Sequence, residues 1–400
     1  MRIIVIGGGV VGVTASYWLR RAGHGVALIE QDSESGRGVS AGNGGQLSYA
    51  YVEPLAGPDL WTKFPGILLG LDSAVRMRPD VSLESIRWGL AFLRQCGAAR
   101  QAEALKALLT LAIESHRALA ELLDDVPLDF DYAAAGKLIL YRDGKSLERA
   151  GKLVEIKRQY GFRLEILDRA RCLALDRALE GYGNGFAGGV YAPEDAAGDC
   201  ALFTRGLYAH LGAMGVETHG STRASHLIVR GGRVAGVALG SGEQLADAVV
   251  LANGIDAPRL AATIGLKLPI EPVKGYSVTA PARPEAPFVS LTDRAEKIVF
   301  ARLGHRLRAA AFADLDGWSP AINPERARQV LALARHLFPM AADWSHAEPV
   351  WAGQRPMTPS GVPLIGESGV PGLYLNAGHG GLGWTLGCGA GKRLAGMIPS

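Results

Sequence analysis

The first thirty residues carry the pattern that most restricts the fold of this chain. A short apolar run at 2–6 leads directly into Gly7-Gly8-Gly9-Val10-Val11-Gly12, and a helical stretch follows at 13–22. A second apolar run at 26–29 ends at the acidic residue Glu30. A strand, a G-x-G-x-x-G turn, a helix and a second strand in this order predict a dinucleotide-binding unit of Rossmann type.

Each part of this unit has a physical role in binding a dinucleotide. Gly7 permits the tight turn, Gly9 lets the backbone approach the pyrophosphate, and Gly12 lets the helix pack closely on the strand. Val10 and Val11 lie at the start of the helix, where free N–H groups and the positive end of the dipole attract phosphate. We therefore expect these five residues to bind the cofactor.

The end of the second strand indicates which dinucleotide is bound. Glu30 can accept hydrogen bonds from both ribose hydroxyls but would repel a 2′-phosphate, which favours FAD or NAD over NADP. Gln31, beside it, is a further candidate contact. The later glycine-rich run 387–392 follows no strand, and Leu386 stands where a phosphate loop needs glycine. One dinucleotide is therefore expected, which disfavours flavin reductases that also bind a pyridine nucleotide.

Composition and charge exclude several other classes of protein. The net charge is only +3 over 400 residues, with no basic cluster that interleaves aromatics, so no nucleic-acid partner is expected. The four cysteines lack metal-ligand spacing, which predicts reduced thiols in a cytoplasmic protein and no metal site. The first strand begins at residue 2, which leaves no room for a signal peptide, and no clean apolar run reaches the length of a membrane span.

A third buried strand, at 248–254, indicates how the chain is organised. It ends in Gly254, and we expect it to join the first two strands in one parallel sheet, with the glycine at the edge where ligands bind. The chain would then leave the cofactor domain and return to it. Further helices are expected over 83–96, 101–123, 145–160 and 201–215, and strands over 136–141, 224–229, 234–239 and 373–376.

An arginine before a proline is the first candidate for substrate binding. Arg355 precedes Pro356, and a residue in that position is pushed to an extended conformation. A guanidinium on stiff backbone is suited to a bidentate grip on a carboxylate. The alternative is a structural ion pair, but the flanking Gly353 and Pro356 favour a binding role.

A second glycine-rich segment, 378–385, follows the expected strand at 373–376 and precedes a helix that runs to Met397. Free N–H groups at that helix start would stabilise the negative charge that a reduced flavin carries at N1 and the C2 carbonyl. His379 is a candidate contact to the ring or the substrate, or else a hydrogen-bonded structural residue. The candidate cofactor contacts in this segment are Gly378, Gly380, Gly381, Leu382, Gly383, Trp384 and Thr385.

At these residues the chain resembles the FAD-dependent D-amino-acid oxidase superfamily, and within it the bacterial D-amino-acid dehydrogenase small (catalytic) subunits. The resemblance covers nearly the whole chain, since its motifs occur in the expected order. They are the amino-terminal fingerprint, Ser40 to Gln46, Gly198 to Thr204, Pro272 to Ser277, Arg355 to Pro359 and Gly378 to Thr385.

The resemblance implies an α/β fold: a Rossmann-type FAD-binding domain, interleaved with an α+β substrate domain built on an antiparallel sheet. We expect residues 1–50, 196–265 and 350–400 to form the FAD-binding domain, and 51–195 and 266–349 the substrate-binding domain. Arg355 would clamp the substrate carboxylate, and Tyr276, Tyr49 and Tyr51 would line the pocket. The remaining implied cofactor contacts are Ser40, Ala41, Asn43, Gly44, Gly45, Gln46 and Gly353.

The implied reaction is oxidative deamination of a D-amino acid to a 2-oxo acid and ammonia. Hydride would pass from Cα to flavin N5, and the electrons would go on to a quinone or an artificial dye. Residues 61–78 mix large apolar and basic side chains. They predict either a lid or domain core, or peripheral contact with the inner face of the cytoplasmic membrane.

Three alternatives remain open from the sequence. A glycine oxidase or hydroxyproline dehydrogenase would share every motif, an NAD-binding dehydrogenase would share Glu30, and a non-catalytic flavin-binding subunit would keep the cofactor alone. The chain also departs from the family pattern. Gly42 and Gly44 stand where alanine is common, which predicts a looser loop, and Ala309–Ala311 replaces a more glycine-rich strand. The chain ends at Ser400, whereas relatives usually carry a further tail. This departure bears on membrane docking and on contacts with the electron acceptor more than on flavin binding.

Overall fold

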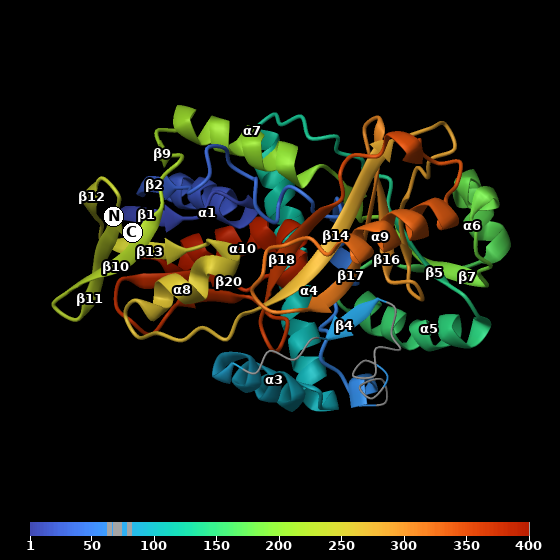
Figure 1. Cartoon of the computed structure of the whole chain (residues 1–400), viewed down its shortest axis with the longest axis horizontal. Coiled ribbons are helices and arrows are strands. Elements are labelled where there is room, and N and C mark those ends of the chain that lie inside the picture. Colours follow the sequence, from blue (N-terminus) through green and yellow to red (C-terminus); the bar gives the residue numbers. More distant parts are fainter. Residues whose placement is uncertain (62–65, 67–73, 78–81, 400) are drawn as a thin grey trace.

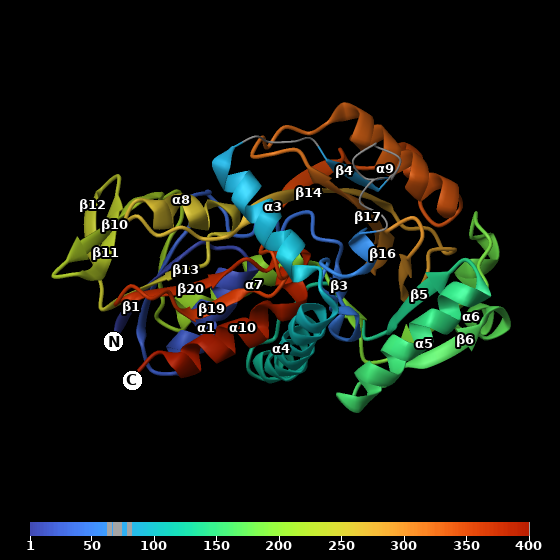
Figure 2. The same ribbon diagram turned by 90° about the horizontal axis from the view of Figure 1, so that it is seen from below.

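The computed structural model describes residues 1–61, 66, 74–77 and 82–399 of the chain. Two sheets of unlike topology face each other, and both chain ends lie close together at one side of the molecule (Figures 1 and 2). Most of the segment 61–78, for which membrane contact was one expectation, lies outside the described residues.

The first sheet has six strands and contains the amino-terminal unit. Its order is β19 (Leu364–Glu367), β20 (Leu373–Ala377), β13 (Ala248–Leu251), β1 (Arg2–Ile6), β2 (Gly25–Ile29) and β9 (Glu217–His219). All neighbours are parallel except β19, which runs antiparallel to β20. The prediction that the strand at 248–254 joins the first two is therefore confirmed, with β20 added on its outer side.

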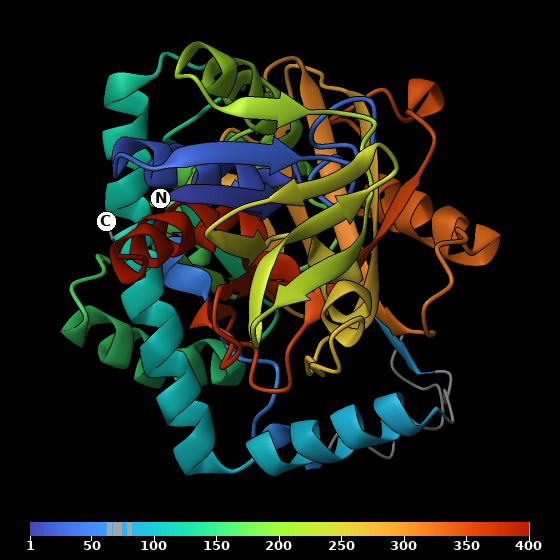
Figure 3. The same cartoon turned by 90° about the vertical axis from the view of Figure 1, so that its left-hand side faces the viewer.

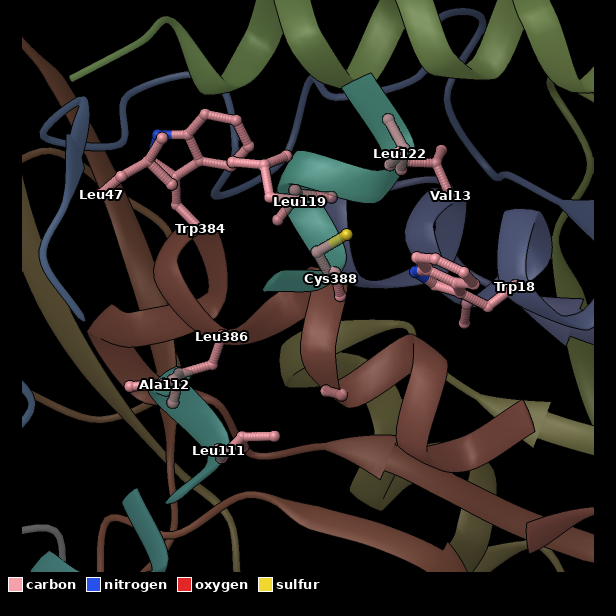
Figure 4. Close-up of a cluster of buried hydrophobic side chains, with 14 of the residues drawn as sticks. Val13, Trp18, Leu47, Leu111, Ala112, Leu119, Leu122, Trp384, Leu386 and Cys388 are labelled. Carbon is pink, nitrogen blue, oxygen red and sulfur yellow. The ribbon is translucent and has the colours of Figure 1, made fainter. Parts of the chain in front are cut away.

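Four helices build the core beside this sheet. They are α1 (Val10–Arg21), α4 (Ala98–Asp125), α7 (Cys200–Ala213) and α10 (Gly383–Met397). α1 packs against α7 and α10, and α10 packs against α4, so that apolar side chains from three of these helices meet (Figure 4). α10 approaches closely because its glycines leave room: a Cβ at Gly389 would lie 2.6 Å from the Ser115 backbone nitrogen. The glycine run 387–392 thus serves helix packing.

The second sheet has nine strands. Its order is β18 (Trp351–Met357), β14 (Glu271–Pro281), β17 (Arg306–Leu315), β16 (Ile298–Leu303), β15 (Ser290–Asp293), β5 (Lys137–Tyr141), β7 (Gly188–Ala192) and β6 (Glu165–Asp168), with β4 (Val75–Met77) beside β17. Most pairs are antiparallel, but β5–β15 and β4–β17 are parallel. Most of this sheet is therefore antiparallel, as expected. The two exceptions are β4 and β5, which come from distant parts of the chain and each pair with one neighbour in parallel.

The remaining elements cover these sheets. A three-stranded sheet of β10 (Ala224–Arg230), β11 (Arg233–Leu239) and β12 (Gly242–Leu245) lies in front of the six-stranded sheet in Figure 3. The other strands and α-helices of the described residues are the pair β3 (Gln46–Leu47) and β8 (Ala196–Ala197), and the helices α3 (Leu83–Gln95), α5 (Gly144–Gln159), α6 (Arg169–Leu175), α8 (Ala257–Ala262) and α9 (Pro324–Leu337). α9 covers the second sheet over β14 and β17.

The expected domain boundaries can be compared with these sheets. Strand β18 lies within the segment 350–400, which we expected in the FAD-binding domain, yet it pairs with β14 of the second sheet. Helix α4 lies within 51–195, which we expected in the substrate domain, yet it packs on α10. We propose that β18 belongs to the substrate domain and α4 to the FAD-binding domain.

Candidate active site

A cavity of about 1420 Å³ lies between the two sheets. On one side it is lined by the carboxyl ends of β1, β13 and β20 and by the first turns of α1 and α10. On the other side it is lined by β14, β16, β17 and β18. The glycine-rich segments that the sequence singled out at opposite ends of the chain therefore border one space.

The amino-terminal glycines shape the end of the cavity beside α1. Gly7 has a φ of +109°, and a Cβ there would lie 2.6 Å from the Ala252 carbonyl oxygen. Gly7, Gly9, Val10 and Val11 line the cavity. Gly12 does not line it, because a Cβ there would overlap the Gly7 carbonyl oxygen, so its role is the close packing of helix on strand.

Glu30, at the end of β2, is held by the backbone. Its carboxylate accepts hydrogen bonds from the N–H groups of Gly8 at 2.5 Å and Asp32 at 2.8 Å. Burial raises the pKa of Glu30, an effect that these hydrogen bonds oppose. Glu30 and Gln31 both line the cavity, so the carboxylate stands in a fixed position where the sequence placed a ribose contact.

The segment 40–46 crosses the face of the second sheet and is anchored to it. Arg308 donates to the Asn43 carbonyl at 3.0 Å, and Gln46 donates to the Leu291 carbonyl at 2.8 Å. A Cβ at Gly42 would overlap the Trp351 ring, so this glycine makes room for the tryptophan. Of the predicted contacts, Ser40, Asn43, Gly44 and Gln46 line the cavity, and Ala41 and Gly45 do not.

Arg355 lies on β18 with its guanidinium over Gly275 of the neighbouring strand. A Cβ at Gly275 would overlap that guanidinium, so glycine is needed for this placement. Nη1 donates to the Phe312 carbonyl at 3.0 Å, and Arg355 makes no ion pair with any residue that the structure describes. Burial lowers the pKa of Arg355, and Asp314 partly opposes that shift. A half-buried guanidinium with unused donors lines the cavity, which favours the carboxylate clamp over the structural ion pair.

Phe312, whose carbonyl binds Arg355, is a residue of the site that the sequence did not indicate. It has a φ of +70°, which non-glycine residues rarely adopt, at a register shift between β14 and β17. The Arg326 guanidinium lies 4.3 Å from the centre of its ring and binds both oxygens of Asp314. These contacts of Arg326 stabilise the strained backbone that directs the Phe312 carbonyl towards Arg355.

His379 is buried and lines the cavity, and its Nε2 has no hydrogen-bond partner in the described part of the chain. Burial lowers its pKa to about 4, so the ring is neutral at physiological pH. A neutral imidazole with an unpartnered nitrogen can bond to a ligand. The alternative, a structural histidine whose Nε2 is hydrogen-bonded to the protein, receives no support from the described residues.

The start of α10 faces the same space. The helix has no side-chain cap, and all seven predicted contacts from Gly378 to Thr385 line the cavity, as does Gly353 of β18. Gly254, at the end of β13, lines it as well. An uncapped helix start leaves N–H groups available for negative charge, which fits the pyrimidine end of a flavin.

The three predicted tyrosines differ in placement. Tyr51 lines the cavity, and its hydroxyl accepts a hydrogen bond from Arg294 at 2.7 Å. Tyr49 does not line it: the short 3₁₀ turn Tyr49–Tyr51 directs this ring into the core against His116, so the predicted contact is wrong. Tyr276 borders the cavity, but its side chain packs in the core beneath α9, on the other face of β14 from Gly275. This orientation does not support a substrate contact by its hydroxyl.

Other features of the described residues bear on cofactor and location. They contain no group of His, Cys, Asp or Glu that could hold a metal ion. The four cysteines are buried and unpaired. Within the described part, no helix is long and apolar enough to cross a membrane.

A family model described as "FAD dependent oxidoreductase" matches residues 2–397. The chain is 41% identical to a D-amino acid dehydrogenase of Paramagnetospirillum magneticum, covering 100% of this chain and 95% of that protein. It is also 41% identical to D-amino acid dehydrogenase 2 of Pseudomonas aeruginosa, covering 99% and 94%. These findings confirm the resemblance that the motifs indicated.

Solved structures share the fold. Glycine oxidase from Geobacillus kaustophilus has a TM-score of 0.76 at 21% identity, covering 99% of this chain and 94% of that one. L-proline dehydrogenase from P. horikoshii has a TM-score of 0.75 at 18% identity, covering 99% and 92%. The predicted fold class, an α/β Rossmann-type domain interleaved with an α+β domain, is therefore confirmed.

Proposed function

Because this chain belongs to the FAD dependent oxidoreductase family, we propose that it oxidises D-amino acids to 2-oxo acids and ammonia. Curated relatives between 35% and 41% identical, named D-amino acid dehydrogenases, support this substrate class over glycine or hydroxyproline. The observation that carries the proposal is Arg355, a half-buried guanidinium with no ion-pair partner among the described residues, in the cavity beside the uncapped start of α10.

The residues around the cavity fit FAD. Gly7, Gly9, Val10 and Val11 would meet the pyrophosphate, and Glu30 the ribose. The segments 40–46 and 378–385 would hold the ring system. When bound, FAD accepts the hydride at N5. The protein supplies a dry site, an oriented substrate and N–H groups for the added negative charge.

Arg355 would orient the substrate by its carboxylate. Two parallel N–H···O bonds fix both the position and the plane of that group, and a desolvated guanidinium binds it more strongly than one in water. Neutral His379 would bond to the substrate or the ring without adding a second positive charge. No protein base is required at Cα, because the hydrogen leaves as hydride while the free amine of the substrate donates its electrons to form an imine. Water then hydrolyses the imine to the 2-oxo acid and ammonia.

We further propose that the electrons pass to a quinone at the cytoplasmic membrane. On α3, Leu83, Ile86 and Leu90 are about half exposed at helical spacing, while Trp88 and Phe92 on the opposite face line the cavity. α3 lies at the edge of the molecule (Figures 1 and 3). A helix that is apolar on both faces would allow an apolar acceptor to reach the cavity wall from a membrane surface.

A product assay tests the proposed reaction. Purified protein with D-alanine and an artificial dye should form one pyruvate and one ammonia for each two electrons taken up by the dye. L-Alanine should give neither product. If no D-amino acid yields a 2-oxo acid under these conditions, the proposal is wrong.

A further inference from the structure

Beside Arg355 the cavity has an apolar wall. Val273 of β14 and Met357 of β18 are buried, pack with Trp88 of α3, and line the cavity. Trp88 donates its Nε1–H to the Met357 carbonyl at 3.0 Å, which leaves only carbon atoms of its ring to face a ligand. The Phe92 ring also lines the cavity and stacks on Trp88, with the ring centres 5.1 Å apart. We call Trp88, Phe92, Val273 and Met357 the apolar wall.

The strand register places the apolar wall next to the guanidinium of Arg355. Val273 pairs with Arg355 across the two strands, and the guanidinium lies over Gly275. Val273 and Gly275 are two residues apart on the same face of β14, which is about 7 Å along the strand. Met357 is likewise two residues from Arg355 on the same face of β18. Side-chain atoms of an amino acid whose carboxylate binds the guanidinium can therefore reach the apolar wall.

The opposite direction along the two strands is covered by an aromatic ring. Gly353 pairs with Gly275, and a Cβ at Gly353 would overlap the Trp351 ring. The same ring lies against Gly42, in the segment 40–46 that would hold the flavin ring system. A substrate side chain in this direction would meet the indole and the cofactor segment. The free direction therefore leads to the apolar wall.

We propose that the apolar wall binds the side chain of the D-amino acid, so that the protein favours large apolar substrates such as D-norleucine. This inference rests on the proposed function and adds the substrate class to it. Contact with the wall removes the four-carbon side chain of D-norleucine from water, which stabilises the bound state. D-Ornithine has a side chain of the same length that ends in an ammonium, and this group would lose its hydration among apolar side chains.

The rate of flavin reduction tests the proposal, measured anaerobically by stopped flow without an electron acceptor. Omission of the acceptor separates the effect of the substrate side chain from that of a quinone at the same wall. For wild-type protein, the second-order rate constant for D-norleucine should exceed those for D-alanine and D-ornithine at least roughly tenfold, because three further carbon atoms are buried.

Two outcomes of this measurement would overturn the inference. The first is an equal rate constant for D-norleucine and D-alanine. The second is a preference for D-ornithine. Glu271, which accepts a hydrogen bond from the Ser85 hydroxyl, is two residues from Val273 on the same face of β14, and its carboxylate would then be the group that selects the substrate.

Trp88→Gln tests the wall itself. Glutamine keeps an N–H donor and favours a helix, but it lacks the apolar surface of the indole. The ratio of the rate constants for D-norleucine and D-alanine should fall roughly tenfold. Leu90→Gln is the matched control, because Leu90 lies on the exposed face of the same helix and outside the cavity lining. An unchanged ratio in Trp88→Gln, or the same fall in Leu90→Gln, would show that Trp88 does not select the substrate.

Binding of simple carboxylates to wild-type protein keeps the inference testable if Trp88→Gln does not fold. Acetate, butanoate and hexanoate should each perturb the visible flavin spectrum, and the affinity should rise about threefold to fourfold for each added methylene. Hexanoate should bind at least roughly tenfold more tightly than 5-aminopentanoate, which has the same length but ends in an ammonium. Affinities that do not depend on chain length, or tighter binding of 5-aminopentanoate, would contradict the apolar wall.

Failure of this inference can be distinguished from failure of the proposed function. A protein whose flavin is reduced by D-alanine as fast as by D-norleucine loses only the inference about the side chain. A protein whose flavin is reduced by no D-amino acid loses the proposed function.

Discussion

Single residues carry the chemistry of this cavity, and they differ in how far the sequence could identify them. Arg355 could be identified because a proline fixes its backbone. Its support by the Phe312 carbonyl and by Gly275 could not, because it depends on a strained residue and a register shift in another strand. Trp88 lies within an ordinary helical pattern, so its contact with Val273 and Met357 becomes visible only once α3 and the sheet are assembled.

Replacement of Arg355 by alanine should weaken substrate binding without loss of the flavin. Removal of a charged bidentate contact costs on the order of 2–5 kcal/mol, so kcat/KM for D-amino acids should fall by at least roughly 30-fold. Stopped-flow reduction with a series of substrate concentrations measures this. Arg302→Ala, in β16 of the same sheet but outside the cavity lining, is the control. Normal affinity in Arg355→Ala would show that the clamp lies elsewhere.

His379 predicts a specific pH dependence of stability. Its folded pKa of about 4 is depressed below the unfolded value of about 6.5, so the unfolded chain takes up a proton first as pH falls. The stability due to the neutral ring is complete above about pH 6.5 and is lost as pH falls towards 4. His379→Gln should reduce this acid-induced loss by up to roughly 3 kcal/mol.

Urea unfolding at several pH values measures that difference. The exposed histidine of α9, His336, provides the control, because His336→Gln makes the same substitution outside the cavity lining. Stability curves for His379→Gln and wild type that stay parallel from pH 7 to pH 4.5 would contradict the predicted effect of His379.

At the scale of elements, local patterns predicted three neighbouring parallel strands of the six-stranded sheet. The strands at 2–6, 26–29 and 248–251 are apolar runs that end in glycine or acid, and such runs form buried parallel strands. The second sheet was harder to predict, because its parallel pairs β5–β15 and β4–β17 join segments far apart in sequence. The prediction that Tyr49 lines the pocket is wrong for a local reason, because a 3₁₀ turn directs neighbouring side chains in different directions.

The glycines of α10 predict an element-level effect on stability. In Gly389→Ala the new Cβ would lie 2.6 Å from the Ser115 backbone nitrogen, so α10 and α4 would have to separate. We expect a loss of about 1–3 kcal/mol in the free energy of unfolding. Gly396→Ala, in the same helix with no atom near the new Cβ, should be neutral or slightly stabilising. Urea denaturation of both variants measures their free energies of unfolding. Equal values would contradict the role of Gly389 in the packing of α10 on α4.

At the scale of the whole molecule, the two sheets form one cavity whose outer wall includes α3, and the exposed face of that helix predicts membrane binding. Wild-type protein should co-sediment with phosphatidylethanolamine–phosphatidylglycerol vesicles. The double variant Ile86→Glu, Leu90→Glu should bind at least roughly tenfold more weakly, because two apolar side chains are lost from the contact.

Val229→Glu serves as the control for that experiment. Val229 is similarly exposed but lies on β10, in another part of the molecule (Figure 1). This variant should bind vesicles like the wild type. Equal binding by all three proteins would show that α3 is not the docking face.

We propose that the cavity brings FAD and a D-amino acid together. An anaerobic visible spectrum of the purified protein, recorded before and after addition of D- or L-amino acids, tests this proposal. We expect oxidised flavin bands that bleach with D-amino acids and persist with their L-enantiomers. A yellow protein that no D-amino acid bleaches, or a colourless one that takes up no added FAD, would contradict it.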